Sequence, residues 1–459
     1  MYKKVVVGLA GCALTTLLAT PAAADTWRDE QYWLEDYGFT QAWDTSMGEG
    51  VTIGVIDTGI DSSHQDLSGQ IVGGYDASGA GDPDGTTPVG PDPNHGTMVA
   101  SLLAGHGHGD PPELEEEDEE SDDEDSDDEE SSDDEADDEE AEDEEPEEEV
   151  EPEPIDEFGT DGILGTAPKA DILSVSVLLD DTAEGVPSVD EQIADGMHWL
   201  IDQGADVINI SLASSEQDWP ESWDDAFLAA EQHDVVVVVA AGNRASGSDI
   251  VGAPATIPGV LTVAGLDQDG SASWDASTQG ITIGVAAPAD PLIGALPGDE
   301  YTHWSGTSGA APLVSGLAAL IRADDPSMPA PQVINRILET AQDTGDAGQD
   351  HLYGRGIIDA AAALTADVPA VSANPMGSIA DWITLHRRGE LQDVPTEDEG
   401  RESAGSIDYP TEVPQAAQLE QPSNIVQPIV VISALILLLV AVTTALILLR
   451  KQPKKHQSL

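Results

Sequence analysis

Cysteine and basic side chains are scarce in this sequence. Of its 459 residues only Cys12 is a cysteine, so the chain cannot form a disulfide within itself. Lysine and arginine together number 15, against 90 aspartates and glutamates, and the formal net charge is −75. Because phosphate binding requires clustered lysine and arginine, this balance argues against nucleic acid as a partner. The charge instead favours a soluble, self-repelling surface.

The first 24 residues have the layout of a secretory signal peptide. A basic start precedes an apolar run over 5–19, and small residues lead up to Ala24. We therefore predict a signal peptide over 1–24 that is cleaved after Ala24. The residues around Cys12 also resemble a lipoprotein box, and cleavage there would leave Cys12 lipidated.

A second targeting signal lies towards the other end of the sequence. Residues 425–449 carry no charge and are numerous enough to cross a bilayer as a helix. The basic segment 450–459 follows at once, whereas the residues before the run are acidic or neutral. Since positive residues stay on the cytoplasmic side, we predict a cytoplasmic basic tail and an extracytoplasmic position for 25–424. The expected localisation is the cell membrane, with a single transmembrane helix.

Composition divides the remainder into three regimes. A peptidase-sized globular domain is predicted over 25–365. It is interrupted at 110–157 by a run of glutamate, aspartate and serine, whose like charges cannot bury apolar area. We predict that this insertion is disordered. The proline-rich residues 366–424 are predicted to form a linker or stalk that joins the domain to the membrane.

Short β-branched apolar runs alternate with helical patterns through the globular part. Continuous apolar runs of this kind are typical of strands covered on both faces, and the alternation predicts an α/β domain with a mainly parallel sheet. Functional groups then gather beyond the carboxyl ends of the strands. The predicted strands are 51–57, 171–178, 206–212, 235–242, 261–266 and 281–287, and the predicted helices are 95–104, 188–203, 222–232, 307–323 and 331–341.

Three polar residues stand at such positions. Asp57 ends the first strand in VIDTGID, His95 opens a helix in NHGTMVA, and Ser308 opens another in SGTSGAAP. Hydrolysis of an amide near neutral pH requires an activated hydroxyl, a base that takes its proton, and a group that orients the base. We predict these roles for Ser308, His95 and Asp57 respectively. The Ser308 N–H and the Asn243 amide, in AAGN after a strand, are predicted to bind the oxyanion.

These blocks resemble the subtilase family. VIDTGID, NHGTMVA, ISLA, AAGN and GTSGAAP match its motifs in the family's order, over about residues 28 to 365. The resemblance implies a subtilisin-like three-layer fold, a serine endopeptidase and a polypeptide substrate. It implies no cofactor for the reaction and no assignable metal ligand, although structural Ca²⁺ is common in the wider family.

The resemblance also implies where substrate binds. We expect it beside Ser211, Leu212 and Ala213 and beside Ala241 and Gly242. At Ala213 the family usually has glycine, so the added methyl should narrow the primary specificity pocket.

The overall layout is most similar to the mycosins, a subtilase subgroup associated with type VII secretion. Signal peptide, proline-rich stalk, membrane helix and basic tail follow that plan, as does a short N-terminal extension expected to wrap on the domain. The resemblance therefore implies the type VII membrane complex as a partner. Two alternatives remain: a mainly structural component of such a complex with secondary proteolytic activity, and a general cell-surface protease.

Overall fold

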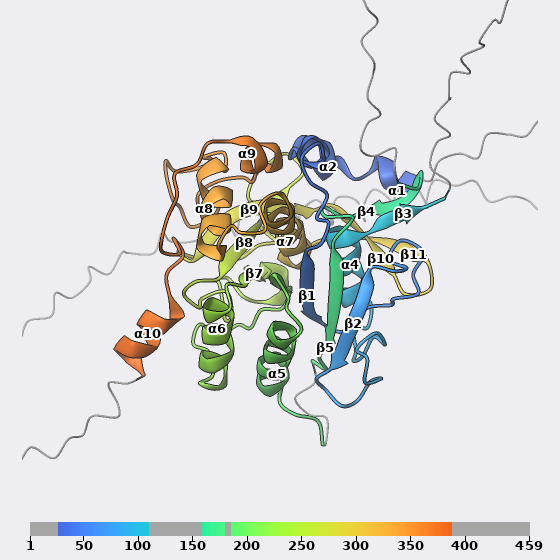
Figure 1. Cartoon of the computed structure of the whole chain (residues 1–459), viewed down its shortest axis with the longest axis horizontal. Coiled ribbons are helices and arrows are strands. Elements are labelled where there is room, and N and C mark those ends of the chain that lie inside the picture. Colours follow the sequence, from blue (N-terminus) through green and yellow to red (C-terminus); the bar gives the residue numbers. More distant parts are fainter. Residues whose placement is uncertain (1–25, 110–157, 180–184, 388–459) are drawn as a thin grey trace, which may run out of the picture. The chain divides into compact units, whose positions relative to one another are not determined.

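The apolar runs of the sequence assemble into one parallel sheet. In the computed structural model, which describes residues 26–109, 158–179 and 185–387, the strand order is β2-β5-β1-β6-β7-β8-β9 (Figure 1). Every neighbouring pair in this sheet is parallel. The strands are β1 (Thr52–Asp57), β2 (Ile71–Asp76), β5 (Asp171–Ser176), β6 (Val207–Ile210), β7 (Val236–Ala240), β8 (Leu261–Asp267) and β9 (Ile283–Asp290).

Helices cover both faces of the sheet. One pair, α5 and α6, packs together and contacts β1, β5 and β7, while α4 and α7 pack together and contact β1 and β6 to β9 (Figure 1). The three-layer α/β arrangement with a mainly parallel sheet is thus confirmed. The longer helices are α4 (His95–Ala104), α5 (Val189–Asp202), α6 (Ser222–Gln232), α7 (Thr307–Asp324) and α8 (Ala330–Thr340), and each agrees with a predicted helix to within one residue at either end.

The N-terminal segment is folded onto the domain through three short helices. Trp33 and Trp43 are almost fully buried, and the indole N–H of Trp43 donates to the carbonyl of Thr166 at 3.0 Å. The side chain of Gln31 both donates to the carbonyl of Leu164 and accepts from its N–H. These contacts agree with the expected wrapping of the extension. The helices are α1 (Thr26–Asp29), α2 (Tyr32–Asp36) and α3 (Phe39–Trp43).

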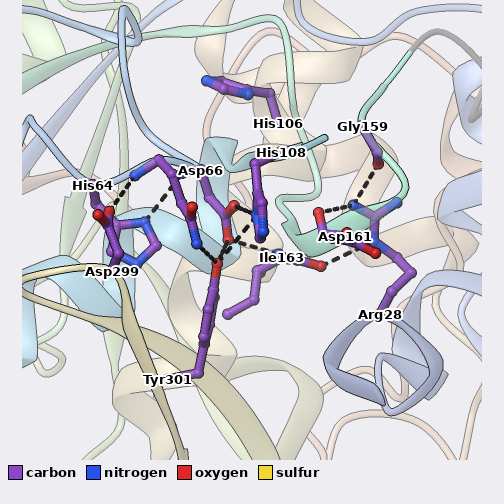
Figure 2. Close-up of polar contacts among 12 residues, drawn as sticks. Arg28, His64, Asp66, His106, His108, Gly159, Asp161, Ile163, Asp299 and Tyr301 are labelled. Atoms are coloured by element: carbon purple, nitrogen blue, oxygen red, sulfur yellow. Dashed lines mark hydrogen bonds and ion pairs between the residues drawn. The ribbon is translucent and has the colours of Figure 1, made fainter. Parts of the chain in front are cut away.

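A fully buried carboxylate, Asp66, joins three segments that are distant in the sequence (Figure 2). It pairs with Nδ1 of His108 at 2.7 Å and accepts the N–H of Ile163 at 2.8 Å. It also accepts the hydroxyl of Tyr301 at 2.9 Å. Asp66 therefore links the loop before β2 to the β3–β4 pair and the β10–β11 hairpin. Their strands are β3 (His106–His108), β4 (Asp161–Leu164), β10 (Leu292–Leu296) and β11 (Glu300–Trp304).

The β3–β4 pair also holds the two ends of the acidic insertion. His108 pairs with Asp161 across the antiparallel ladder. The guanidinium of Arg28 in α1 donates to the carbonyls of Gly159, Asp161 and Gly162, each at 3.1 Å (Figure 2). The chain thus enters and leaves the insertion at adjacent points. The predicted insertion itself, 110–157, lies outside the described residues.

The C-terminal part of the domain extends further than the sequence analysis placed it. Residues 366–387, assigned there to the stalk, are folded, and α10 (Ile379–His386) packs on α6. Trp382 packs against Trp219, and Arg387 forms an ion pair with Asp224 at 2.7 Å. These contacts come from isolated aromatic and charged residues, which a compositional reading assigns to a linker. A further short helix, α9 (Ala360–Thr365), precedes this stretch.

No helix within the described ranges is long and apolar enough to span a membrane. The predicted signal peptide 1–24, the rest of the stalk, the membrane segment 425–449 and the tail 450–459 lie outside those ranges.

The Asp66 contacts predict a large loss of stability on neutralisation of this carboxylate. Asp66→Asn should lower the free energy of unfolding by about 2–3 kcal/mol, because buried donors lose their charged acceptor. Urea unfolding followed by circular dichroism measures the change. Asp84→Asn is the matched control, since Asp84 is exposed and its carboxylate accepts from Thr86 within its own turn. Equal stability of the two variants would contradict the role assigned to Asp66.

Candidate active site

Asp57 and His95 meet where β1 ends and α4 begins. Nδ1 of His95 lies 2.7 Å from one carboxylate oxygen of Asp57 and 2.9 Å from the other. Asp57 is fully buried, and its Oδ1 also accepts the N–H of Thr58 at 2.7 Å. The close approach needs glycine at position 96, because a Cβ there would lie 2.2 Å from the carbonyl oxygen of Gly59. The carboxylate can therefore fix the tautomer and orientation of the imidazole.

The surroundings of His95 favour its protonated form. Burial lowers the pKa of His95, but the charge and hydrogen bond of Asp57, together with the charge of Asp92, outweigh it. The pKa therefore lies above the ordinary value of 6.5. The His95 and Trp304 rings also pack in a T-shaped arrangement, with ring centroids 5.9 Å apart. A base of this kind is suited to taking a proton and holding the resulting charge beside Asp57.

Ser308 lies in the first turn of α7 and is positioned through its backbone. Its carbonyl accepts the hydroxyl of Ser211 at 2.9 Å, and its own hydroxyl donates to the carbonyl of Ser211 at 3.0 Å. Asn209 donates to the Ser211 hydroxyl and accepts from Ser315, each at 2.9 Å. This buried chain of polar groups ties α7 to β6. In the structure the Ser308 hydroxyl thus donates to Ser211, and no hydrogen bond joins it to His95 within the described residues.

The amide of Asn243 is oriented by Thr307. Its Oδ1 accepts the N–H of Thr307 at 2.8 Å and the Thr307 hydroxyl at 3.0 Å. The carbonyl end of the amide is therefore occupied, while its Nδ2 donates to no other residue in the described part of the chain. Asn243 and Ser308 line the same cleft. Nδ2 of Asn243 and the N–H of Ser308 are thus donors available to a developing oxyanion.

The cleft measures about 460 Å³ and has an unpaired backbone edge. Leu212 and Ala213 line it, and their backbone groups form no hydrogen bond with any other described residue. An extended peptide can pair with such an edge. A Cβ built on Gly242 would lie 3.4 Å from the Cβ of Ala213, so the methyl faces Gly242 and narrows the space between them.

Among the residues predicted to bind substrate, Ala241 is the one that does not line the cleft. It is fully buried, its N–H is bonded to Val263, and its carbonyl is bonded to Thr278. Its neighbours Ala240 and Gly242 line the cleft instead. The alternation of a strand places consecutive residues on opposite sides, which the AAGN motif alone did not resolve.

Several cleft residues were not identified from the sequence. Trp304, Asp92, Leu179 and Thr307 belong to this group. Thr307 belongs to the GTSGAAP motif, and Asp92 lies three positions before His95. Both residues could therefore have been predicted from the motifs. Leu179 directly follows the predicted strand 171–178, and Trp304 comes from a segment without a recognisable pattern. In the described ranges no group of three or more His, Cys, Asp or Glu side chains could hold a metal ion.

Residues 48–356 match the sequence profile of the subtilase family. An alignment of 329 residues with subtilisin DY of Bacillus licheniformis gives 31% identity and covers 69% of this chain and 91% of subtilisin DY. The chain belongs to the subtilase family. This subtilase is also 29% identical over 373 residues to fervidolysin of Fervidobacterium pennivorans, covering 74% of its own length. It spans 44% of fervidolysin, less than half of that relative.

Solved structures similar to this subtilase include mycosins. The crystal structure of MycP1 from Mycobacterium smegmatis gives a TM-score of 0.54 at 26% identity, covering 76% of this chain and 88% of MycP1. The crystal structure of MycP1 from the ESX-1 type VII secretion system gives a TM-score of 0.55 at 26% identity. The match covers 78% of this chain and 91% of that MycP1 chain.

The crossing of α4 over the loop after β1 predicts that Gly96→Ala breaks the Asp57–His95 contact. Alanine normally stabilises a helix, but here its Cβ meets a backbone oxygen that cannot move aside. We expect a lower melting temperature and loss of the downfield proton signal that the histidine–carboxylate hydrogen bond produces. Gly73→Ala is the control, since the nearest atom to its Cβ is the flexible end of Leu173. An unchanged proton signal in the Gly96 variant would show that the crossing tolerates a methyl.

Proposed function

We propose that this subtilase is a serine endopeptidase that hydrolyses polypeptides through Ser308, His95 and Asp57. The contact that carries the proposal is the hydrogen bond between Asp57 and His95, which holds an imidazole in the same cleft as the Ser308 hydroxyl. The unpaired backbone of Leu212 and Ala213 in that cleft supports a polypeptide substrate in extended form.

In the proposed reaction, the Ser308 hydroxyl turns from Ser211 to His95 and attacks the peptide carbonyl while His95 takes its proton. Asp57 stabilises the imidazolium, and Nδ2 of Asn243 and the N–H of Ser308 donate to the oxyanion. His95 then protonates the leaving amine, which leaves an acyl group on Ser308. In the second half of the reaction, His95 takes a proton from a water molecule, which attacks the carbonyl of the acyl group. Ser308 regains a proton from His95, and the carboxylic acid product is released. All proton transfers are performed by side chains, so we propose no cofactor for the reaction.

We further propose that the enzyme is anchored in the cell membrane and works beside a type VII secretion complex. The targeting patterns at 1–24 and 425–449 and the basic tail 450–459 support a domain outside the cytoplasm. The likeness to MycP1 from the ESX-1 type VII secretion system supports the link to secretion.

The endopeptidase proposal predicts covalent labelling of Ser308 by a fluorophosphonate probe. The purified full-length protein should be labelled, and both Ser308→Ala and His95→Ala should abolish labelling, because the probe needs an activated hydroxyl. Ser327→Ala, which alters an exposed serine in a turn after α7, should label like the parent. In-gel fluorescence followed by mapping of the labelled peptide measures the result. A folded parent that is not labelled, or that is labelled at another serine, would refute the proposed roles.

The secretion proposal predicts different effects of deletion and of inactivation. Deletion of the gene should stop type VII secretion, as measured by immunoblots of the culture supernatant. Ser308→Ala protein expressed in the deletion strain shows whether proteolysis is the required part. If the variant restores secretion, the protein acts in the complex mainly as a structural component. Normal secretion in the deletion strain would rule out the link.

A further inference from the structure

One carboxylate stands in the active-site cleft outside the catalytic residues. Asp92 lines the cleft together with His95, Thr58 and Leu179. Asp92 and His95 are the titratable side chains among the residues that line it, and the others are apolar, hydroxyl-bearing, amide or glycine. Asp92 is therefore the acidic side chain among the residues that line the cleft.

The carboxylate of Asp92 has no partner in the described part of the chain. It is exposed, and it forms no hydrogen bond or ion pair with another described residue. Asp82 and Asp84, earlier in the same loop, each accept a threonine hydroxyl, at 2.6 and 2.9 Å. Asp92 thus keeps its full capacity to bind a cation.

The loop presents this carboxylate in a restricted conformation. Pro91 and Pro93 flank Asp92, and each proline fixes its own φ and limits the residue before it. After Pro93 and Asn94, His95 is the first residue of α4. Less backbone freedom is therefore lost when Asp92 binds a partner than in an unrestrained loop.

Asp92 lines the same cleft as His95 and Ser308. Its negative charge also contributes to raising the pKa of His95. Leu212 and Ala213, along which a bound peptide is expected to lie, line this cleft together with Asp92 and His95. A long cationic side chain beside the scissile bond can reach Asp92 from there.

We propose that Asp92 is a specificity-determining residue that selects a lysine or arginine side chain next to the scissile bond. The inference rests on the proposed endopeptidase function. An anionic side chain at the same position is repelled by the carboxylate. The net charge of −75 acts in the same direction, because it raises the concentration of cationic polypeptides around the protein.

The test compares internally quenched peptides that differ at one position. Arginine, norleucine or glutamate is placed in turn at each position from three before to two after the scissile bond. At one position next to the bond, kcat/KM of the parent should be about fivefold higher with arginine than with norleucine, as for an ion pair at a partly exposed site. Glutamate should be the poorest residue there, and the preference should shrink at high salt.

The ratio of kcat/KM for arginine and norleucine peptides isolates this contact, because an altered His95 affects all peptides alike. Asp92→Asn should bring the ratio below about twofold, and Asp92→Lys should make glutamate better than arginine, if the pairing supplies the preference. Asp202→Asn is the matched control: it removes the same charge from an exposed residue at the end of α5 and should leave the ratio unchanged.

The possible failures are distinguishable. A parent that cleaves the peptides without preferring arginine at any position would overturn the role of Asp92 and leave the endopeptidase function intact. A preference for arginine that persists in both Asp92 variants would likewise overturn the role of Asp92 and leave the endopeptidase function intact. A folded parent that cleaves no peptide and takes no fluorophosphonate label would overturn both proposals.

Discussion

The hydrogen bond between Asp57 and His95 is the contact on which the arrangement of this site depends. It exists because a parallel sheet ends β1 at the edge where α4 begins, and because Gly96 lets the helix approach the loop after that strand. The same edge receives Ser211 after β6 and Asn243 after β7. Any shift of α4 away from β1 would leave Ser308 without an oriented base.

Buried polar contacts keep the other half of the site in register with that pair. The chain from Ser315 through Asn209 and Ser211 ties α7 to β6, and its last hydrogen bond ends on the backbone of Ser308. Thr307 occupies the carbonyl end of the Asn243 amide and leaves its Nδ2 available. Because buried polar groups are costly when unpaired, these contacts specify one arrangement of the nucleophile and the oxyanion donors.

Much of this was predictable from the sequence, for identifiable reasons. The six predicted strands and five predicted helices are long and strongly patterned, and the motifs around Asp57, His95 and Ser308 fall at their ends. The folded segment 366–387 was missed, since it is held by tertiary contacts such as Trp382 on Trp219. Strand β2 was missed because two glycines interrupt its apolar run. The exact lining of the cleft was also beyond reach: Ala241 faces inward, while Trp304 and Asp92 face the cleft.

The most direct test of the Asp57–His95 contact is the pH dependence of kcat/KM on an uncharged peptide nitroanilide. Only neutral His95 can take the proton of Ser308, and its pKa is raised, so activity of the parent should fall with decreasing pH through a midpoint above 6.5. Asp57→Asn should lower the plateau at higher pH by about 10⁴-fold, as expected when the base loses its orienting carboxylate. A parent midpoint below 6.5, or a variant within tenfold of the parent, would contradict the account.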